Sequence, residues 1–530
     1  MKDNLKKSFE IRSVVCYFIL IFLFLISALR IYDIMQRDYT SVQAEQSSYR
    51  VSIAKTRGTV FDRNMIPFTN TERKIMAVVS PVKRAITALS SKLSDEELKR
   101  VSEELKNGFP AVCELEKEID CDGIYCKEVF VHNSFDMPAS HIIGYNDASL
   151  HGVCGIEAAY DDLLSSNRTV DAVFTTDGKG RILSGISPFF ENDFNVSSNY
   201  VVTTLDYNIQ QTAQRLSSGL KKGVIIVADA KTSKIRAMVS KPDFEVTDIK
   251  NYLNDKNSPL LNRALSSYNV GSVFKPCVAA AAFESNMADF AYNCTGSTHI
   301  IDRNFNCHKL DGHGKVNLKK AIAYSCNTFF YNFSQKVGAE KIYKKARETG
   351  FGARIKIADG IYTSAGTLPY IESLENKAQL ANFSIGQGKL TASPVCLLNL
   401  YCAIANKGCY YVPSVIEKTF KDGKESKYDI GSKTRIMSQS NAGILKEYLK
   451  GVIDDGTGKQ AKPKKCTAAG KTATAQTGRY DSDKKEITNS WFCGFFPFDN
   501  PEYTVIVMSE GESDVSTASI FSKIADELCK

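Results

Sequence analysis

Ser272 and Lys275 are the pair of residues in this sequence best suited to carry out chemistry. They lie in the segment Gly271–Lys275, which is followed by an apolar, alanine-rich stretch. If that stretch is helical, Ser272 lies at its N-terminus and Lys275 lies one turn further along the same face. A serine hydroxyl is a weak nucleophile without a base, and a lysine serves as that base only where its ammonium form is disfavoured. The spacing predicts such a pair, although a capping serine beside a surface lysine gives the same pattern.

Two further motifs follow downstream. The first, Ser325–Asn327, comes after a helix-like run and would present a hydroxyl and an amide at the end of that helix. The second, Lys471–Thr474, lies among small residues, which favours a strand whose edge can hydrogen-bond an extended peptide beside a cation. Each motif alone also fits an ordinary loop cap or a solvent-facing strand. In the order Ser-x-x-Lys, Ser-x-Asn, Lys-Thr-small, they form the serine acyl-transfer set of the penicillin-interacting enzymes.

A mixed α and β domain must position these motifs. Residues 201–216 are typical of a strand followed by a helix, and residues 223–238 of a β-hairpin. The polar, Gly- and Ser-rich segment 162–195 that precedes them predicts the region of an interdomain linker. We therefore expect a first extracytoplasmic domain over 32–196 and a catalytic domain over 197–530.

The N-terminus predicts a membrane anchor. Ser13–Leu29 carries no charge and is flanked by Arg12 and Arg30. About 17–20 apolar residues in a helix span a bilayer core, and basic residues before the span keep that end in the cytoplasm. The sequence thus predicts a cytoplasmic tail over 1–12 and a single-pass anchor over 13–31. A signal peptide is the alternative, but its apolar region is usually shorter and ends in a cleavage site.

The composition limits the class of protein. A length of 530 residues exceeds what one hydrophobic core organises, so two or more domains are expected. Hydrophobic residues at 43% and charged residues at 24% are globular values, which exclude a disordered, collagen-like or coiled-coil chain. The 67 basic and 59 acidic residues give a net charge of +8, without a basic cluster of the kind that binds nucleic acid. No nucleic-acid partner is expected.

Beyond the three motifs, the chain resembles class B penicillin-binding proteins, which are monofunctional D,D-transpeptidases of bacterial cell-wall synthesis. The resemblance is carried by RGTVFDRN (57–64), GVCGIEAAYDDLL (152–164), NRALSSYNVGSVFKP (262–276), GHGKVNLKKAIAYSCNTFFY (312–331), SIGQGKLTASP (384–394), AGKTATAQTG (469–478) and WFCGFFP (491–497). It implies an α+β chain with a transmembrane helix, a β-rich elongated pedestal domain and a transpeptidase domain. In the last, an antiparallel sheet is flanked by helices, as in serine β-lactamases.

The resemblance also implies a role for each motif residue. Ser272 attacks the penultimate D-Ala carbonyl of a peptidoglycan stem peptide, and Lys275 accepts its proton. Ser325 relays a proton toward the leaving amine, and Asn327 holds the substrate amide or orients Lys275. The backbone N–H groups of Ser272 and Thr474 form the oxyanion hole. β-Lactam antibiotics acylate the same Ser272.

The last motif binds the substrate carboxylate in this scheme. Lys471 attracts the terminal carboxylate and helps to keep Lys275 neutral, while Thr472 and Thr474 hydrogen-bond the carboxylate. The sequence departs from the family at Ala473, where the usual residue is glycine. A methyl group there lies where a ligand backbone approaches closely. We expect a changed affinity for β-lactams and retained activity.

Cysteine and histidine residues gather in one segment. Cys294 and Cys307 are followed closely by His308, Asp311 and His313. Three interpretations stay open: a disulfide in an extracytoplasmic loop, a zinc site, and free thiols. The zinc site would use two thiolates with one or two of the other three side chains, and Cys294, Cys307 and His313 are its candidate ligands. The transpeptidase reaction itself requires no cofactor.

Two other functions compete with this interpretation. A β-lactamase or β-lactam sensor shares the serine–lysine chemistry, and Glu372–Asn376 superficially resembles an element that supplies a base for hydrolysis, although an exposed polar helix explains it better. A catalytically silent wall-binding scaffold is the second, and the presence of all three motifs argues against it. The resemblance further implies a polytopic glycan polymerase as partner in the bacterial cell membrane, with the N-terminus cytoplasmic and the catalytic domain outside.

Overall fold

A computed structural model of the chain describes residues 2–36, 48–183, 185–192, 196–429, 431–480 and 482–529. The described residues form two compact units: the first lies within 1–54, 74–129 and 169–193, and the second within 55–73, 130–168 and 194–530. Helices and strands occur in both units, which confirms the expected α+β class. The domain limits drawn from the sequence, 32–196 and 197–530, stay a prediction.

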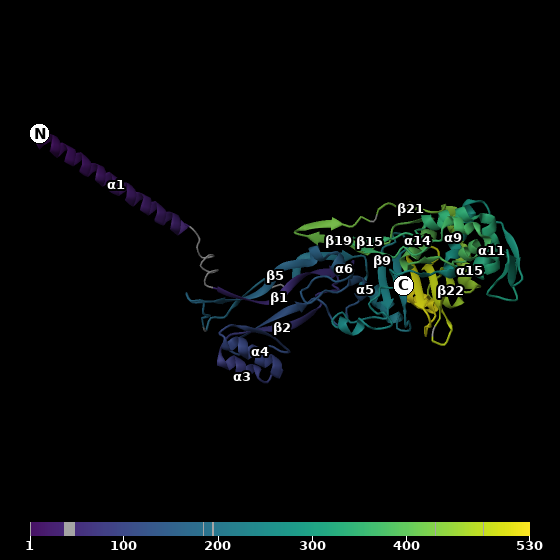
Figure 1. Cartoon of the computed structure of the whole chain (residues 1–530), viewed down its shortest axis with the longest axis horizontal. Coiled ribbons are helices and arrows are strands. Elements are labelled where there is room, and N and C mark those ends of the chain that lie inside the picture. The colour runs from purple at the N-terminus through teal and green to yellow at the C-terminus, as the bar shows by residue number, and fades with distance from the viewer. Residues whose placement is uncertain are drawn as a thin grey trace. The chain divides into compact units, whose positions relative to one another are not determined.

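The N-terminal helix α1 (Lys2–Gln36) is the purple helix at the N mark of Figure 1. Its 20-residue segment Val14–Asp33 is strongly apolar, with a mean hydropathy of 2.6. At 1.5 Å per residue this length matches a hydrocarbon core of about 30 Å. Within the described part of the chain, α1 is the single helix long and apolar enough to cross a membrane. The structure therefore fits the single-pass anchor expected at 13–31.

A small antiparallel sheet with two helices makes up part of the first unit. The strand order is β3 (Ala111–Leu115), β2 (Glu72–Val79), β4 (Ile124–Val131), and the helices are α3 (Lys83–Leu89) and α4 (Asp95–Lys106). α4 begins at the Ser94 cap, whose hydroxyl accepts the N–H of Glu97 at 3.3 Å. Its apolar stripe buries Val101 and Leu105 in the same core as the sheet.

The segment expected as a linker forms strands over much of its described length. β5 (Ser165–Thr175) pairs antiparallel with β6 (Phe189–Glu191), while residues 184 and 193–195 lie outside the described ranges. Val170, Ala172 and Phe174 are buried at every second position. This alternation is that of a half-buried strand, and the flanking Gly and Ser residues obscured it in the sequence.

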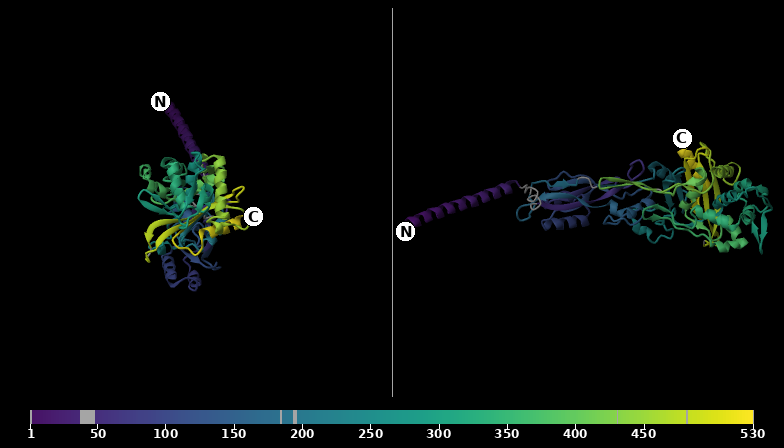
Figure 2. Two further views of the ribbon diagram at one scale, coloured as in Figure 1. Left: turned by 90° about the vertical axis from the view of Figure 1, so that its right-hand side faces the viewer. Right: turned by 90° about the horizontal axis from the view of Figure 1, so that it is seen from above.

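The second unit is organised by a five-stranded antiparallel sheet. Its order is β22 (Ala469–Tyr480), β23 (Glu486–Phe496), β24 (Tyr503–Glu510), β8 (Gly223–Asp229), β9 (Ile235–Lys241). β8 and β9 form the hairpin expected over 223–238. Figure 2 shows these two teal strands with the yellow strands from the end of the chain, so distant segments complete one sheet. β22 lies at the edge of the sheet, and no other described strand pairs with its outer side.

Both faces of this sheet are covered by helices. α8 (Tyr207–Leu216) and α16 (Thr517–Leu528) pack on one face, and α9 (Lys275–Glu284), α14 (Pro394–Ala405) and α15 (Gln439–Asp454) lie on the other. In β8, Ile225 and Val227 are buried on the face that α8 and α16 cover, whereas Val224 and Ile226 are buried on the opposite face. Because side chains alternate along a strand, a continuous apolar run is buried on both faces. Figure 1 shows α9, α14 and α15 near β22 in the green-to-yellow region.

A buried ion pair joins two of the segments that carried the family resemblance. Arg57 and Glu157 are both almost fully buried and lie 2.6 Å apart. His132 Nε2 contacts the other oxygen of Glu157 at 2.9 Å, and Asp161 contacts Arg57 at 2.8 Å. Removing one partner would leave an uncompensated buried charge, which is strongly destabilising. The ion pair therefore holds 57–64 against 152–164.

One disulfide, which sequence analysis did not anticipate, lies within the second unit. Cys466 is bonded to Cys529 across a sequence separation of 63 residues. It joins the segment just before β22 to the residue that follows α16. The bond therefore restrains the strand that carries Lys471 from its N-terminal side.

Candidate active site

The nucleophile candidate Ser272 lies in a short 3₁₀ turn, η2 (Gly271–Phe274), that continues directly into α9. Lys275 is the first residue of α9 and is fully buried, so the pair lies one turn apart as expected. α9 is buried over almost its whole length, because its small alanine side chains let neighbouring elements pack closely around it. A rigid core element therefore positions the serine and the lysine.

Hydrogen bonds connect Lys275 to Ser272 through Ser325. Lys275 Nζ donates to Ser325 O at 2.8 Å, to Ser325 Oγ at 3.1 Å and to Asn327 Oδ1 at 2.7 Å. The Ser325 hydroxyl in turn donates to Ser272 Oγ at 3.0 Å. The four residues taken from two sequence motifs thus meet in one continuous hydrogen-bonded chain.

Ser325 lies in the turn between α10 (Leu318–Ala323) and α11 (Asn327–Val337). Its φ is +56°, in the left-handed region that non-glycine residues seldom adopt. This conformation directs both the carbonyl and the hydroxyl of Ser325 toward Lys275 Nζ. Such strain, which the surrounding packing must maintain, is frequent at functional sites.

The environment of Lys275 favours its neutral form. Complete burial lowers the pKa of Lys275 from 10.5 to about 7, an effect that negative charge on the nearby Cys326 and Cys307 sulfur atoms partly opposes. Desolvation disfavours a charged ammonium more than a neutral amine. Near neutral pH this amine therefore exists in both protonation states and can accept or donate a proton.

Strand β22 supplies the third motif and alternates as a strand should. Lys471 and Ala473 are buried, whereas Thr472 is half-buried and Thr474 is exposed. Thr472 Oγ1 lies 2.7 Å from Thr457 Oγ1. Burial, and secondly the charge of Lys275, hold the pKa of Lys471 well below its ordinary value of 10.5. The two lysines therefore share one buried, electrostatically coupled site.

An open groove of about 1180 Å³ runs along β22. Its lining includes Ser272, Ser325, Asn327, Thr472, Ala473 and Thr474. A peptide placed along the unpaired edge of β22 would meet backbone hydrogen-bonding groups as well as these side chains. Glu372 and Glu375, considered above as a hydrolytic element, lie in η3 (Ile371–Glu375), and neither is among the described residues that line the groove.

Gly271, the residue before Ser272, packs closely against β22. Its φ is +61°, and a Cβ at this position would lie 3.0 Å from Ala475 Cβ and 3.5 Å from Ala473 Cβ. The Ala473 methyl therefore lies close to the residue preceding the nucleophile, as well as at the groove. This contact was not apparent in the sequence, because it depends on how η2 packs against the strand.

Gly271→Ala is expected to slow acylation by a fluorescent penicillin roughly 10- to 100-fold, because displacing Ser272 by a fraction of an ångström disturbs the attack geometry. The control is Gly423→Ala, where φ is also positive, at +81°, but a Cβ would meet nothing within 4 Å. The rate constant of labelling is measured for both proteins. Equal rates in the two variants would show that the contact with β22 has no catalytic consequence.

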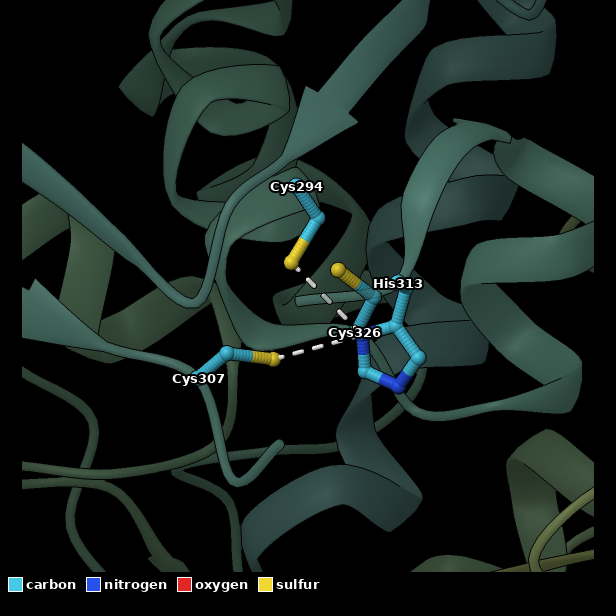
Figure 3. Close-up of side chains that lie close together, drawn as sticks. All are labelled: Cys294, Cys307, His313 and Cys326. Carbon is cyan, nitrogen blue, oxygen red and sulfur yellow. Dashed lines mark hydrogen bonds between the residues drawn. The ribbon is translucent and has the colours of Figure 1, made fainter. Parts of the chain in front are cut away.

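The candidate metal ligands Cys294, Cys307 and His313 also come together, and Cys326 joins them. Cys294, Cys307 and Cys326 are free thiols, so the structure contains no disulfide between Cys294 and Cys307. His308 lies beside the group, with Nδ1 3.9 Å from Cys307 Sγ, but outside the four-residue cluster. Cys326, the middle residue of the Ser-x-Asn motif, was not among the candidate ligands predicted from the sequence, although it lies in this cluster (Figure 3). Nothing in the sequence relates it to residues 13 or more positions earlier.

Known sequences resemble this chain over much of its length. The family model described as Penicillin binding protein transpeptidase domain matches residues 223–529. The peptidoglycan D,D-transpeptidase MrdA of Acinetobacter baumannii is 29% identical over 426 residues, which cover 72% of this chain and 61% of the relative. Stage V sporulation protein D of Bacillus subtilis is 27% identical over 513 residues, covering 89% of this chain and 77% of the relative. The match thus spans less than two thirds of the first relative and about three quarters of the second.

Solved structures share the fold. Penicillin-binding protein 3 of Mycobacterium tuberculosis, complexed with ampicillin, has a TM-score of 0.65 at 23% identity and covers 90% of this chain and 95% of its own. The penicillin-binding protein PBP2 of Helicobacter pylori, in complex with MreC, has a TM-score of 0.65 at 21% identity and covers 91% of this chain and 99% of its own. At these identities the likeness concerns the fold alone.

Proposed function

The chain belongs to the penicillin-binding protein transpeptidase family, as a class B member, and from this premise we propose that it cross-links peptidoglycan stem peptides by serine acyl transfer at D-Ala-D-Ala. The observation that carries the proposal is the hydrogen-bonded chain from Lys275 through Ser325 to Ser272, which opens onto a peptide-sized groove. β-Lactams are proposed to acylate the same serine.

Acylation begins with neutral Lys275. The Ser272 hydroxyl transfers its proton through the Ser325 hydroxyl to Lys275 Nζ as Ser272 Oγ bonds to the penultimate D-Ala carbonyl carbon. The proton then returns through Ser325 to the nitrogen of the terminal D-Ala, the C–N bond breaks, and D-alanine leaves. An acyl-enzyme remains on Ser272, and Lys275 is neutral again.

The negative charge of the tetrahedral intermediate needs donors. The backbone N–H groups of Ser272 and Thr474 serve as the oxyanion hole, and each such donor is typically worth about 3–4 kcal/mol in the transition state. The amine of a second stem peptide then attacks the acyl-enzyme carbonyl with proton transfer back along the same route. This step forms the cross-link and restores the Ser272 hydroxyl.

Substrate binding couples the two lysines. The terminal carboxylate binds near Lys471, with hydrogen bonds from Thr472 and Thr474, and its negative charge raises the pKa of Lys471 from the depressed value of the free site. The positive charge of protonated Lys471 then disfavours protonation of Lys275, so Lys275 stays neutral. The correct substrate thereby helps to prepare the base that the reaction needs.

The reaction uses no cofactor in this proposal, and any zinc held by Cys294, Cys307 and His313 has a structural role. We place the enzyme in a bacterial cell membrane, with α1 as anchor, its N-terminus in the cytoplasm and the second unit outside. A polytopic glycan polymerase, implied by the family resemblance, is the proposed membrane partner. The Helicobacter pylori protein was solved in complex with MreC, so a protein similar to MreC is a second candidate partner.

Intact-protein mass spectrometry after penicillin treatment tests the function. We expect one adduct per chain, mapped to the peptide that contains Ser272. Nitrocefin separates this enzyme from a β-lactamase: a transpeptidase gives one stoichiometric burst, because its acyl-enzyme hydrolyses slowly. Rapid steady hydrolysis would identify a β-lactamase, and absence of any adduct would favour a silent scaffold.

A further inference from the structure

The cluster behind the Ser-x-Asn turn has the chemistry of a metal site. Cys294, Cys307 and Cys326 are each at most 2% exposed, and His313 is half-buried. The three sulfur atoms and one ring nitrogen all lie within 4.8 Å of one another. Figure 3 shows the three thiols and the imidazole pointing toward a common centre. Three thiolates and an imidazole are a donor set that structural zinc sites use.

The spacing of these atoms fits a tetrahedral ion. His313 Nδ1 lies 3.6 Å from Cys294 Sγ and 3.6 Å from Cys307 Sγ. With Zn–S bonds of about 2.3 Å and Zn–N bonds of about 2.0–2.1 Å, a tetrahedron places sulfur and nitrogen about 3.6 Å apart.

Strand pairing and close backbone contacts hold the segments that carry the ligands next to one another. Cys294 ends β11 (Ala291–Cys294), which pairs with β14 (Gly314–Asn317) so that Cys294 faces Gly314, the neighbour of His313. A Cβ on Gly312 would lie 2.2 Å from Cys294 O, and this glycine has a φ of +77°, so only glycine allows that approach. The Cys307 N–H donates to Gly296 O at 2.8 Å.

Neighbouring groups support the sulfur ligands. The Thr328 hydroxyl donates to Cys294 Sγ at 3.0 Å and lies 3.5 Å from Cys326 Sγ. Hydrogen bonds of this kind orient thiolate ligands and are a regular part of metal sites. The four ligands come from β11, the loop after β13 (Arg303–Asn306), the loop before β14 and the cap of α11, so one ion would tie four elements together.

We infer that Cys294, Cys307, His313 and Cys326 bind one zinc ion, and that this ion holds the turn that presents Ser325 and Asn327 to Lys275. Cys326 is the residue between Ser325 and Asn327, and both of these contact Lys275 Nζ. The left-handed conformation of Ser325 requires external support, and a ligand bond at the adjacent residue supplies it. Cys326 is therefore a positioning residue. The coupling to catalysis rests on the proposed function, whereas metal binding does not.

Metal content of the purified full chain, in detergent and without added zinc, tests the site. Elemental analysis is expected to find about one zinc per chain, reduced at least about tenfold in Cys294→Ser, which changes a ligand remote from the reacting atoms. The matched control is Cys402→Ser, another fully buried free cysteine, in α14; it should retain the metal. Cobalt substitution should give visible absorption of a tetrahedral thiolate site in the wild type and lose it in Cys294→Ser.

Removing the metal should also slow acylation of Ser272 by a fluorescent penicillin at least about fivefold, and adding zinc back should restore the rate. The adduct should still form in the metal-free protein, only more slowly. Wild-type protein that contains no zinc, that contains iron instead, or that forms a disulfide between any two of the three cysteines would overturn the site. If the protein contains zinc but the acylation rate does not change when the zinc is removed, the positioning role would be overturned. Absence of penicillin labelling in zinc-loaded protein would contradict the proposed function alone.

Discussion

Ser272→Ala is expected to lower the rate of covalent labelling by penicillin at least about 10³-fold, because the variant lacks the hydroxyl oxygen that forms the acyl bond in the proposed reaction. Among the described hydrogen bonds the Ser272 side chain takes part in one, which it accepts from Ser325, so its loss should leave the fold intact. The rate is followed by gel fluorescence with a labelled penicillin, and the melting temperature of each protein is measured in parallel.

Ser285→Ala is the matched control for this substitution. Ser285 follows α9 at its other end, and its hydroxyl bonds only the Ala281 carbonyl, at 2.9 Å, among the described hydrogen bonds. This variant should be labelled at the wild-type rate. If Ser272→Ala were labelled as rapidly as Ser285→Ala, another residue would be the nucleophile and the assignment of all three motifs would be wrong.

Lys275→Ala is expected to slow acylation about 10²- to 10⁴-fold, which is the usual contribution of a general base. Lys275→Arg should show a similar loss, because a guanidinium stays charged and cannot accept the Ser272 proton. The comparison separates proton transfer from simple electrostatic attraction. Both variants are tested for acylation at saturating and at low penicillin, so that binding and chemistry are distinguished.

Lys345 offers a control for the burial of a lysine. It is also buried, but its ammonium pairs with Glu284 and Glu348, and these hydrogen bonds and charges raise its pKa against the effect of burial. Lys345→Met should change the melting temperature and leave the acylation rate near the wild-type value. Loss of acylation in Lys345→Met equal to that in Lys275→Ala would mean that general disruption of the core, rather than loss of the base, explains the result.

The sequence was sufficient to find the reacting residues because their types and order are specific. Ser272, Lys275, Ser325 and Asn327 were expected to act together, and they form one hydrogen-bonded chain. The strand character of Lys471–Thr474 also followed from small and β-branched residues, and β22 is an edge strand as expected. Their individual catalytic roles stay predictions that the variants above test.

Features that depend on packing between distant segments could not be found in this way. The proximity of Gly271 to Ala473 and Ala475 arises only when η2 meets β22. Cys326 joins Cys294 and Cys307 only when the cap of α11 lies behind two hairpins. Patterns over a few neighbouring residues indicate the conformation of a segment and which of its faces is buried. They do not indicate which other segment packs against that face, and these contacts depend on that packing.

The pH dependence of acylation by penicillin tests the central claim, which is that Ser272 is activated by a neutral Lys275. Because burial lowers the pKa of Lys275 to about 7 and the deprotonated amine is the active form, the rate constant should rise about tenfold per pH unit below pH 7 and reach a plateau above it. A rate that keeps rising toward pH 10, as for a lysine of ordinary pKa, or one independent of pH, would contradict the account.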